Sequence, residues 1–315
     1  MSTTPPISPR PRLPSPLQEL QDDRFTRHGV TLALKRDDLI HPDLPGNKYR
    51  KLFLNLDAAV TAGHEALLTF GGAYSNHLRA TAAAGRLLGM DTIGMVRGDE
   101  LSKRPLNPSL AQCAADGMRL HFIDRSTYRR KTDPEVLAAL VHEAGARNPY
   151  VIPEGGSNSL AVQGCTALGE ELRGHTDTAA VACGTGGTLA GMAGGLAPGQ
   201  RALGIPVLKG GFLGREIQAL QQQTFGAPTA NWHLDERFHF GGYARTTPEL
   251  TAFANDFEDR HGLSVERVYV AKLLYALTAL SEEGTFAPGT KVTAVITATD
   301  PATPTAHSSQ SSTSR

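Results

Sequence analysis

The chain has 315 residues, enough to bury a sizeable core as one large domain or two of ordinary size. Basic and acidic residues balance at 31 each, so no net field draws the protein toward nucleic acid or an anionic membrane surface. We therefore expect a small-molecule partner, with no nucleic-acid and no membrane partner.

Stretches that predict strands alternate with stretches that predict helices along most of the chain. The clearest unit runs from Glu65 to Val96, where an apolar strand, a Gly-Gly turn, a helix and a second strand follow one another. Such alternation indicates an α/β fold with a parallel sheet covered on both faces. We expect strands at 66–70, 92–96, 119–123, 150–152, 178–183, 202–208 and 291–297, and helices at 77–88, 108–117, 134–144, 160–172, 189–196, 248–261 and 270–283.

The two ends of the chain have the composition of disordered segments. Residues 1–16 are rich in Pro, Ser and Arg and lack the apolar core of a signal peptide, and we expect a disordered arm over 1–13. Residues 300–315 are mainly Pro, Ala, Ser and Thr, which predicts a disordered tail. No segment approaches the ~20 apolar residues of a membrane span, so we expect a cytoplasmic protein.

The three cysteines carry no recognisable framework. Cys113, Cys165 and Cys183 are far apart and show neither the spacing of metal ligands nor that of a disulfide scaffold. We expect reduced, mostly buried thiols and no metal site.

A glycine-rich turn joins the strand expected at 178–183 to the next helix. It reads Gly184-Thr185-Gly186-Gly187-Thr188. Free backbone amides, two hydroxyls and the positive end of a helix suit a phosphate monoester. The turn lacks the lysine of a nucleotide P-loop, and an ordinary tight turn explains a motif this short about equally well.

A second polar turn follows the strand expected at 66–70. Ser75, Asn76 and His77 bring polar groups into one small volume. Ser75 or Asn76 could simply cap the helix. A histidine in the first helical turn has no such capping advantage, which favours a functional His77.

A third segment places basic residues at a probable helix start. Lys48 follows Gly46 and Asn47 there, where the helix dipole disfavours a cation. A lysine with a disfavoured cation can offer its free amine to a carbonyl, as Schiff-base chemistry requires. From charge pattern alone, a solvated basic face made of Lys48, Arg50 and Lys51 is the more probable interpretation.

Together these segments resemble the pyridoxal-phosphate family that contains D-cysteine desulfhydrase and 1-aminocyclopropane-1-carboxylate deaminase. The resemblance implies the two-domain, open parallel-sheet fold of the tryptophan synthase beta-like (fold type II) enzymes, and usually a homodimer. It implies a large domain of residues 14–51 plus 154–299 and a small inserted domain of residues 52–153. The matching segments are 14–18, 35–38, 46–52, 75–77, 155–157, 184–188 and 268–269.

The resemblance assigns a role to each candidate residue. Lys48 would form the Schiff base with pyridoxal 5'-phosphate and shuttle the substrate proton, and Asn76 would bind the ring hydroxyl. Ser75 and His77 would meet the substrate carboxylate or assist proton transfer. The remaining site residues are Thr185, Gly186, Gly187 and Thr188, for the phosphate, and the active-site tyrosines Tyr243 and Tyr269.

Two departures from the family pattern bear on the reaction. Val270 stands where the deaminases carry Glu and desulfhydrase-like members commonly carry Thr, and valine cannot bind the pyridine nitrogen. The final turn of the family is replaced by Thr297-Ala298-Thr299-Asp300, in which Thr297 or Thr299 could supply a hydroxyl.

The leading function is a carbon–sulfur lyase acting on a small amino acid, with D-cysteine as the first substrate. Deaminase, racemase or another amino-acid lyase activity are alternatives within the family. Two alternatives are of other classes. One is a protein that binds the cofactor or an amino acid without turnover, and the other is a nucleotide-binding α/β protein, which the 184–188 turn suggests.

Overall fold

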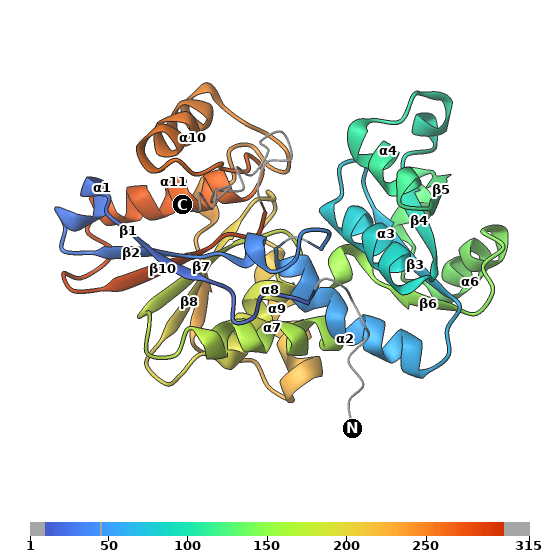
Figure 1. Cartoon of the computed structure of the whole chain (residues 1–315), viewed down its shortest axis with the longest axis horizontal. Coiled ribbons are helices and arrows are strands. Elements are labelled where there is room, and N and C mark those ends of the chain that lie inside the picture. Colours follow the sequence, from blue (N-terminus) through green and yellow to red (C-terminus); the bar gives the residue numbers. More distant parts are fainter. Residues whose placement is uncertain (1–9, 45, 299–315) are drawn as a thin grey trace, which may run out of the picture.

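The computed structural model describes residues 10–44 and 46–298, so the expected tail and most of the expected N-terminal arm lie outside the described residues. It contains two sheets that lie in separate halves of the molecule, with helix α2 (Asn47–Thr61) running between them (Figure 1). Within the described residues, no helix is both long and apolar enough to cross a membrane.

The larger sheet contains strands from both the N-terminal and the C-terminal part of the described chain. Its strand order is β1-β2-β10-β7-β8-β9, and its neighbours run parallel except for β1, which is antiparallel to β2. The parallel sheet expected from the sequence is confirmed for β2, β10, β7, β8 and β9, and β1, which the sequence did not predict, adds an antiparallel edge beside β2. The strands are Leu17–Leu20, Thr31–Lys35, Lys291–Val295, Thr178–Cys183, Arg201–Pro206 and Trp232–Leu234 in the order β1, β2, β10, β7, β8 and β9.

The smaller sheet is built entirely from the middle of the chain. Its order is β5-β4-β3-β6 and every neighbouring pair is parallel. The strands are Ala66–Gly71 (β3), Asp91–Arg97 (β4), Met118–Ile123 (β5) and Pro149–Ile152 (β6).

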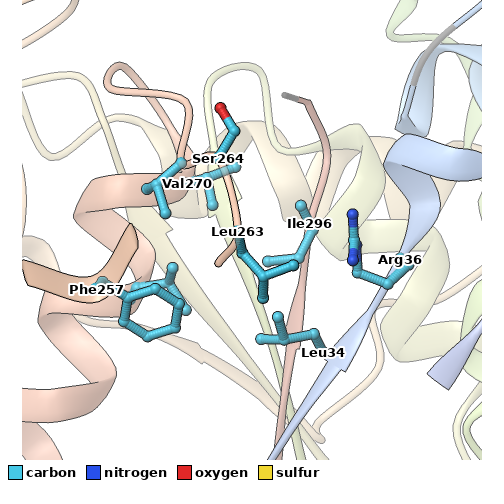
Figure 2. A pocket seen from close by; sticks show the side chains of 9 residues that line it. Leu34, Arg36, Phe257, Leu263, Ser264, Val270 and Ile296 are labelled. Carbon is cyan, nitrogen blue, oxygen red and sulfur yellow. The ribbon is translucent and has the colours of Figure 1, made fainter. Parts of the chain in front are cut away.

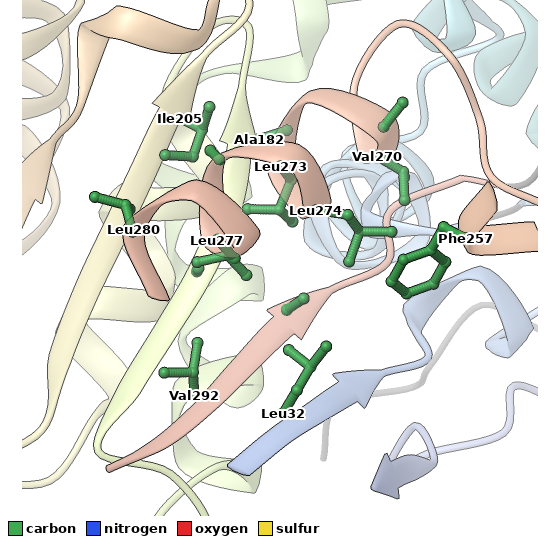
Figure 3. Packing of buried hydrophobic residues seen from close by; sticks show 14 of the residues in the cluster. Leu32, Ala182, Ile205, Phe257, Val270, Leu273, Leu274, Leu277, Leu280 and Val292 are labelled. Carbon is green, nitrogen blue, oxygen red and sulfur yellow. The ribbon is translucent and has the colours of Figure 1, made fainter. Parts of the chain in front are cut away.

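Helices cover both faces of each sheet, because each sheet has apolar residues on both faces. Figure 3 shows α11 laid across the larger sheet, with Leu273, Leu274, Leu277 and Leu280 above Leu32 and Val292. The larger sheet carries α1 (Asp23–Thr26), α10 (Pro248–His261) and α11 (Val270–Glu282) with one core, and α7 (Ser159–Glu171), α8 (Gly187–Gly195) and α9 (Leu213–Phe225) with another. The smaller sheet carries α3 (Asn76–Leu88), α4 (Pro108–Ala115), α5 (Arg125–Arg129) and α6 (Pro134–Glu143).

The predicted elements are all present, with shifts of one or two residues at most ends. The strand expected at 202–208 ends at Pro206, and the strand expected at 291–297 ends at Val295. The sequence interpretation missed β1, β2, β9 and the short helices α1 and α5. It also missed α9, although the buried residues Leu213, Ile217 and Leu220 have the spacing of an amphipathic helix.

A buried group of charges fixes the position of α2. The guanidinium of Arg50 is 3% exposed and donates to both oxygens of Asp37 and both oxygens of Glu171, each at 2.9 Å. Lys35 Nζ lies 2.6 Å from Glu171 Oε2, and Ser15 Oγ donates to Asp37 at 2.7 Å. The cluster therefore ties α2 to the larger sheet, to α7 and to the N-terminal segment.

Replacing Arg50 with Met should lower the free energy of unfolding by about 3–5 kcal/mol, because it leaves two largely buried carboxylates without their main partner. Denaturant unfolding followed by circular dichroism measures the loss. The matched control is Arg86→Met, since Arg86 also binds two carboxylates, Asp43 and Asp116, but is 43% exposed. The free energy of unfolding of Arg86→Met should fall by no more than ~1 kcal/mol. Equal decreases for the two variants would contradict the role of the buried cluster.

Candidate active site

The glycine-rich turn lies where the sequence predicts it, between β7 and α8. Gly186 has a φ of +78° and occupies the N-cap of α8, with no side chain capping the first amides of that helix. Only glycine adopts this conformation readily. The turn therefore presents backbone N–H groups at the positive end of a nine-residue helix.

Close neighbours explain why positions 184 and 187 of this turn are glycines. A Cβ added to Gly184 would lie 3.2 Å from Tyr269 Oη. A Cβ added to Gly187 would lie 3.1 Å from Ser157 Oγ and 3.3 Å from Lys51 Nζ. Hydroxyls and an ammonium group thus approach the turn from α2, from the 155–157 segment and from the start of α11.

Lys51 is the charged group closest to this turn. Its Nζ donates to the carbonyl of Gly155, to Ser157 Oγ at 2.8 Å and to Thr185 Oγ1 at 3.3 Å. Burial, reinforced by the charge of Lys48, lowers the pKa of Lys51 to about 7. The sequence interpretation did not assign Lys51 to the site. The sequence did carry a signal for Lys51: it lies three residues after Lys48, and residues i and i+3 of a helix share a face.

Lys48 lies in the first turn of α2, as predicted. Its Nζ donates to Asn47 Oδ1 at 3.0 Å, and Asn47 Nδ2 donates to Thr188 Oγ1 at 2.7 Å. Burial lowers the pKa of Lys48 to about 8, and the carboxylate of Glu266 opposes the shift only in part. A polar chain therefore joins an amine with a lowered pKa to the glycine-rich turn.

Gly46 makes this approach of α2 possible. It has a φ of +68°, and an added Cβ would lie 1.6 Å from the carbonyl oxygen of Thr297. Only glycine fits between the start of α2 and the end of the larger sheet. The interpretation of Lys48, Arg50 and Lys51 as a solvated basic face is wrong, because Arg50 is 3% and Lys51 2% exposed.

In the second turn, Ser75 takes the capping role that the sequence left open between Ser75 and Asn76. Ser75 Oγ accepts the N–H of Leu78 at 3.2 Å, and Asn76 is the first residue of α3. Within the described residues, the hydrogen bonds do not join Ser75 or Asn76 to Lys48 or to the glycine-rich turn.

His77 is buried and held in one tautomer. Thr69 Oγ1 donates to the carbonyl of Ile152 at 2.8 Å, so it must accept from His77 Nε2, 2.8 Å away. Burial, followed by the charges of Lys51 and Lys48, holds the pKa of His77 well below its usual value. The ring is therefore neutral at physiological pH, with the lone pair on Nδ1 beside Gly156.

The two predicted tyrosines contact each other. Their ring centroids are 6.0 Å apart with an interplanar angle of 70°. Burial raises the pKa of both, so each keeps its phenolic proton. Glu266, which the sequence interpretation missed, fixes Tyr269 by accepting the N–H groups of Val268, Tyr269 and Val270 at 2.8, 2.7 and 3.2 Å.

Val270 faces the apolar core. It is 1% exposed and lines a small pocket with Leu34, Phe257 and Ile296, which has room for about one water molecule (about 10 Å³; Figure 2). The side chain at this position therefore offers no polar group to a ligand. Thr297 lies 7% exposed beside Gly46, and Thr299 lies outside the described residues.

These groups fit a pyridoxal phosphate. An amine with a pKa of about 8 is available for an aldehyde at Lys48. Backbone amides at the start of α8, the hydroxyls of Thr185 and Thr188, and Nζ of Lys51, whose charged form a phosphate beside it would favour, suit a phosphate. Both requirements are met from adjacent parts of the same site.

Comparisons with known proteins show the family of this chain. The family model described as pyridoxal-phosphate dependent enzyme matches residues 10–298. A putative 1-aminocyclopropane-1-carboxylate deaminase of Pyrococcus horikoshii is 31% identical over 81% of each chain. The bifunctional D-cysteine desulfhydrase/1-aminocyclopropane-1-carboxylate deaminase of Arabidopsis thaliana is 30% identical over 79% of this chain and 67% of its own length.

Among solved structures, one described as an ACC deaminase homologue superimposes with a TM-score of 0.78 at 28% identity, covering 93% of both chains. The match supports the same arrangement of mixed α/β elements around two sheets. The chain is therefore a member of the pyridoxal-phosphate-dependent enzymes of fold type II.

Proposed function

We propose that this protein is a carbon–sulfur lyase that converts D-cysteine, or a closely related small amino acid, to sulfide, pyruvate and ammonia. The observation that carries the proposal is the half-buried Lys48, with its pKa lowered to about 8 and its link through Asn47 to Thr188. The names of the relatives supply the substrate class.

When bound, the cofactor supplies an electron sink for the carbanion at the substrate α-carbon. Lys48 is proposed to carry the cofactor and then, as the free amine, to remove the α-proton. Because its pKa is lowered to about 8, a fraction of Lys48 is neutral near physiological pH and can act as such a base. Lys51, Thr185, Gly186, Gly187 and Thr188 are proposed to hold the phosphate, and Asn76 the ring hydroxyl.

Ser75, His77 and the two tyrosines are proposed to act on the substrate. The neutral ring of His77 and the cap residue Ser75 lie in the turn assigned to the substrate carboxylate. Tyr243 and Tyr269 keep their protons because their pKa values are raised, so they can donate hydrogen bonds to a leaving thiolate.

1-Aminocyclopropane-1-carboxylate deamination is the second candidate, favoured by the names of two relatives. Val270 argues against it, because its buried side chain offers no carboxylate. The proposal includes a large domain of residues 14–51 and 154–299, a small domain of residues 52–153, a homodimer and a cytoplasmic location.

The rate at which the cofactor-free protein captures pyridoxal phosphate should rise as pH passes through about 8 and then level off. Only the neutral amine attacks the aldehyde, and raising pH through the lowered pKa of Lys48 increases the neutral fraction. Growth of the visible absorbance band after mixing, followed across pH, measures the rate. Lys48→Ala should show no protein-bound band, and an inflection near the ordinary lysine value of about 10.5 would contradict the assignment.

Lys51→Met should raise the dissociation constant for pyridoxal phosphate about 10- to 100-fold, because it removes a charge-assisted hydrogen bond to the phosphate. Equilibrium titration of the cofactor-free variants measures the change. Lys51→Arg keeps the charge and is the matched control, for which a smaller loss is expected. Unchanged affinity in Lys51→Met would exclude Lys51 from the phosphate site.

Purified holoenzyme should release sulfide and pyruvate from D-cysteine and release no ammonia from 1-aminocyclopropane-1-carboxylate. Lys48→Ala, with the same cofactor supplied, should release neither product. Sulfide and pyruvate are measured separately, with L-cysteine as the stereochemical control. A cofactor absorbance band without any product would point to a binding protein, and ammonia release from the cyclopropane would favour the deaminase.

A further inference from the structure

Helix α11 holds the segment that carries Tyr243 by one row of side chains. Tyr269, Lys272 and Tyr275 are spaced three residues apart and so share one face of the helix. Phe240 packs against Tyr275 with ring centroids 4.9 Å apart, and Tyr243 packs against Tyr269 at 6.0 Å. The segment between Phe240 and Tyr243 is thus held at both ends by α11.

Lys272, in the middle of this row, binds the turn between those ends. Its side chain is fully buried, and its Nζ donates to the carbonyl of His239 at 2.9 Å and to that of Gly242 at 2.8 Å. The same carbonyls also accept the N–H groups of Gly242 and Arg245, at 3.0 and 3.2 Å. One ammonium group therefore closes the 239–242 turn immediately before Tyr243.

The backbone in and next to this turn adopts conformations that are unfavourable for some of its residues. Phe240 has a φ of 50° and Ala244 a φ of 54°, both in the left-handed region that costs energy for residues with a Cβ. Gly241 and Gly242, with φ of 86° and 116°, add conformational freedom between them. Two backbone hydrogen bonds and the N–H of Gly241, which donates to His239 Nδ1 at 3.0 Å, act within the segment, and Lys272 adds a contact from outside it.

Packing alone does not explain a lysine at position 272. Burying an ammonium group is unfavourable, and burial lowers its pKa to about 8. An apolar side chain would fill the same space within the core of α11 without that cost. What an apolar side chain cannot do is bind two carbonyl oxygens at once.

We propose that Lys272 is a positioning residue, which holds the 239–242 turn and thereby fixes Tyr243 at the active site. The effect on catalysis rests on the proposed function, because it requires that Tyr243 meets the substrate. The effect on the turn does not, and the two parts are tested by separate measurements.

Hydrogen–deuterium exchange of the full-length protein tests the turn. In Lys272→Met, peptides that contain the amides of Gly242 and Arg245 should exchange at least about tenfold faster than in the wild type. Peptides from α8 and from the smaller sheet should exchange as before. The matched control is Lys291→Met, at the exposed start of β10, where no change in the turn is expected; unchanged exchange in Lys272→Met would overturn the proposal.

Kinetics with D-cysteine test the consequence for Tyr243. Lys272→Met should keep the cofactor absorbance band but lose about tenfold or more in kcat/KM, since small displacements of a reacting group are costly. Adding Tyr243→Phe should cause little further loss, because both changes remove the same contribution. Independent, additive losses would overturn the positioning role.

Three further outcomes bear on the proposal. If the wild type turns over none of the tested amino acids, the proposed function fails while the exchange measurement still decides whether Lys272 holds the turn. If Lys272→Met does not fold, Lys272→Gln retains a shorter donor and should show intermediate exchange. If neither variant folds, Lys272 supports the whole packing of α11 and the proposal is wrong.

Discussion

The site depends on how the fold treats the three basic residues at the start of α2. Carboxylates balance the charge of Arg50, whereas Lys48 and Lys51 have no such partner in the described residues. Arg50 binds the carboxylates of Asp37 and Glu171. Within residues 10–44 and 46–298, Lys48 and Lys51 form no ion pair with a carboxylate. Burial therefore acts on both amines almost unopposed, and their pKa values fall to about 8 and about 7.

The same cluster explains how distant segments meet. Arg50 ties α2 to the larger sheet and to α7, so Lys48 and Lys51 are held against the turn that follows β7.

β3, β4 and β6 of the smaller sheet are parallel, and the turn with Ser75 to His77 leaves the carboxyl end of β3. In α/β folds such ends are where ligands collect.

Long periodic elements were predictable from the sequence, and in two cases the bounds agree to the residue. These are β7 at Thr178–Cys183 and α10 at Pro248–His261. Short strands such as β1 and β9 carry too few residues for a periodic signal, and their place is set by pairing with distant strands. The antiparallel edge could not be inferred from alternation of strands and helices alone.

The candidate site was predictable in part. The physical argument nominated Lys48 and the glycine-rich turn, but charge pattern favoured a solvated face for Arg50 and Lys51. Burial of these residues is a tertiary property. Arg50 binds carboxylates 13 and 121 residues away in the chain, and Lys51 binds Gly155, Ser157 and Thr185. The bonds of Lys272 to two carbonyls 33 and 30 residues away likewise join groups whose relation appears only after folding, whereas Glu266 caps amides two to four residues further along the chain.

The central claim is that Lys48, and not its buried neighbour Lys51, bears the cofactor. Borohydride reduction of the holoenzyme, followed by proteolysis and peptide mass spectrometry, fixes a pyridoxyl group to the lysine that held it. The account predicts that the added mass lies on Lys48 and on no other lysine. The same mass on Lys51 would contradict it, because the two amines differ by one turn of α2 and only one of them can face the aldehyde while the other meets the phosphate.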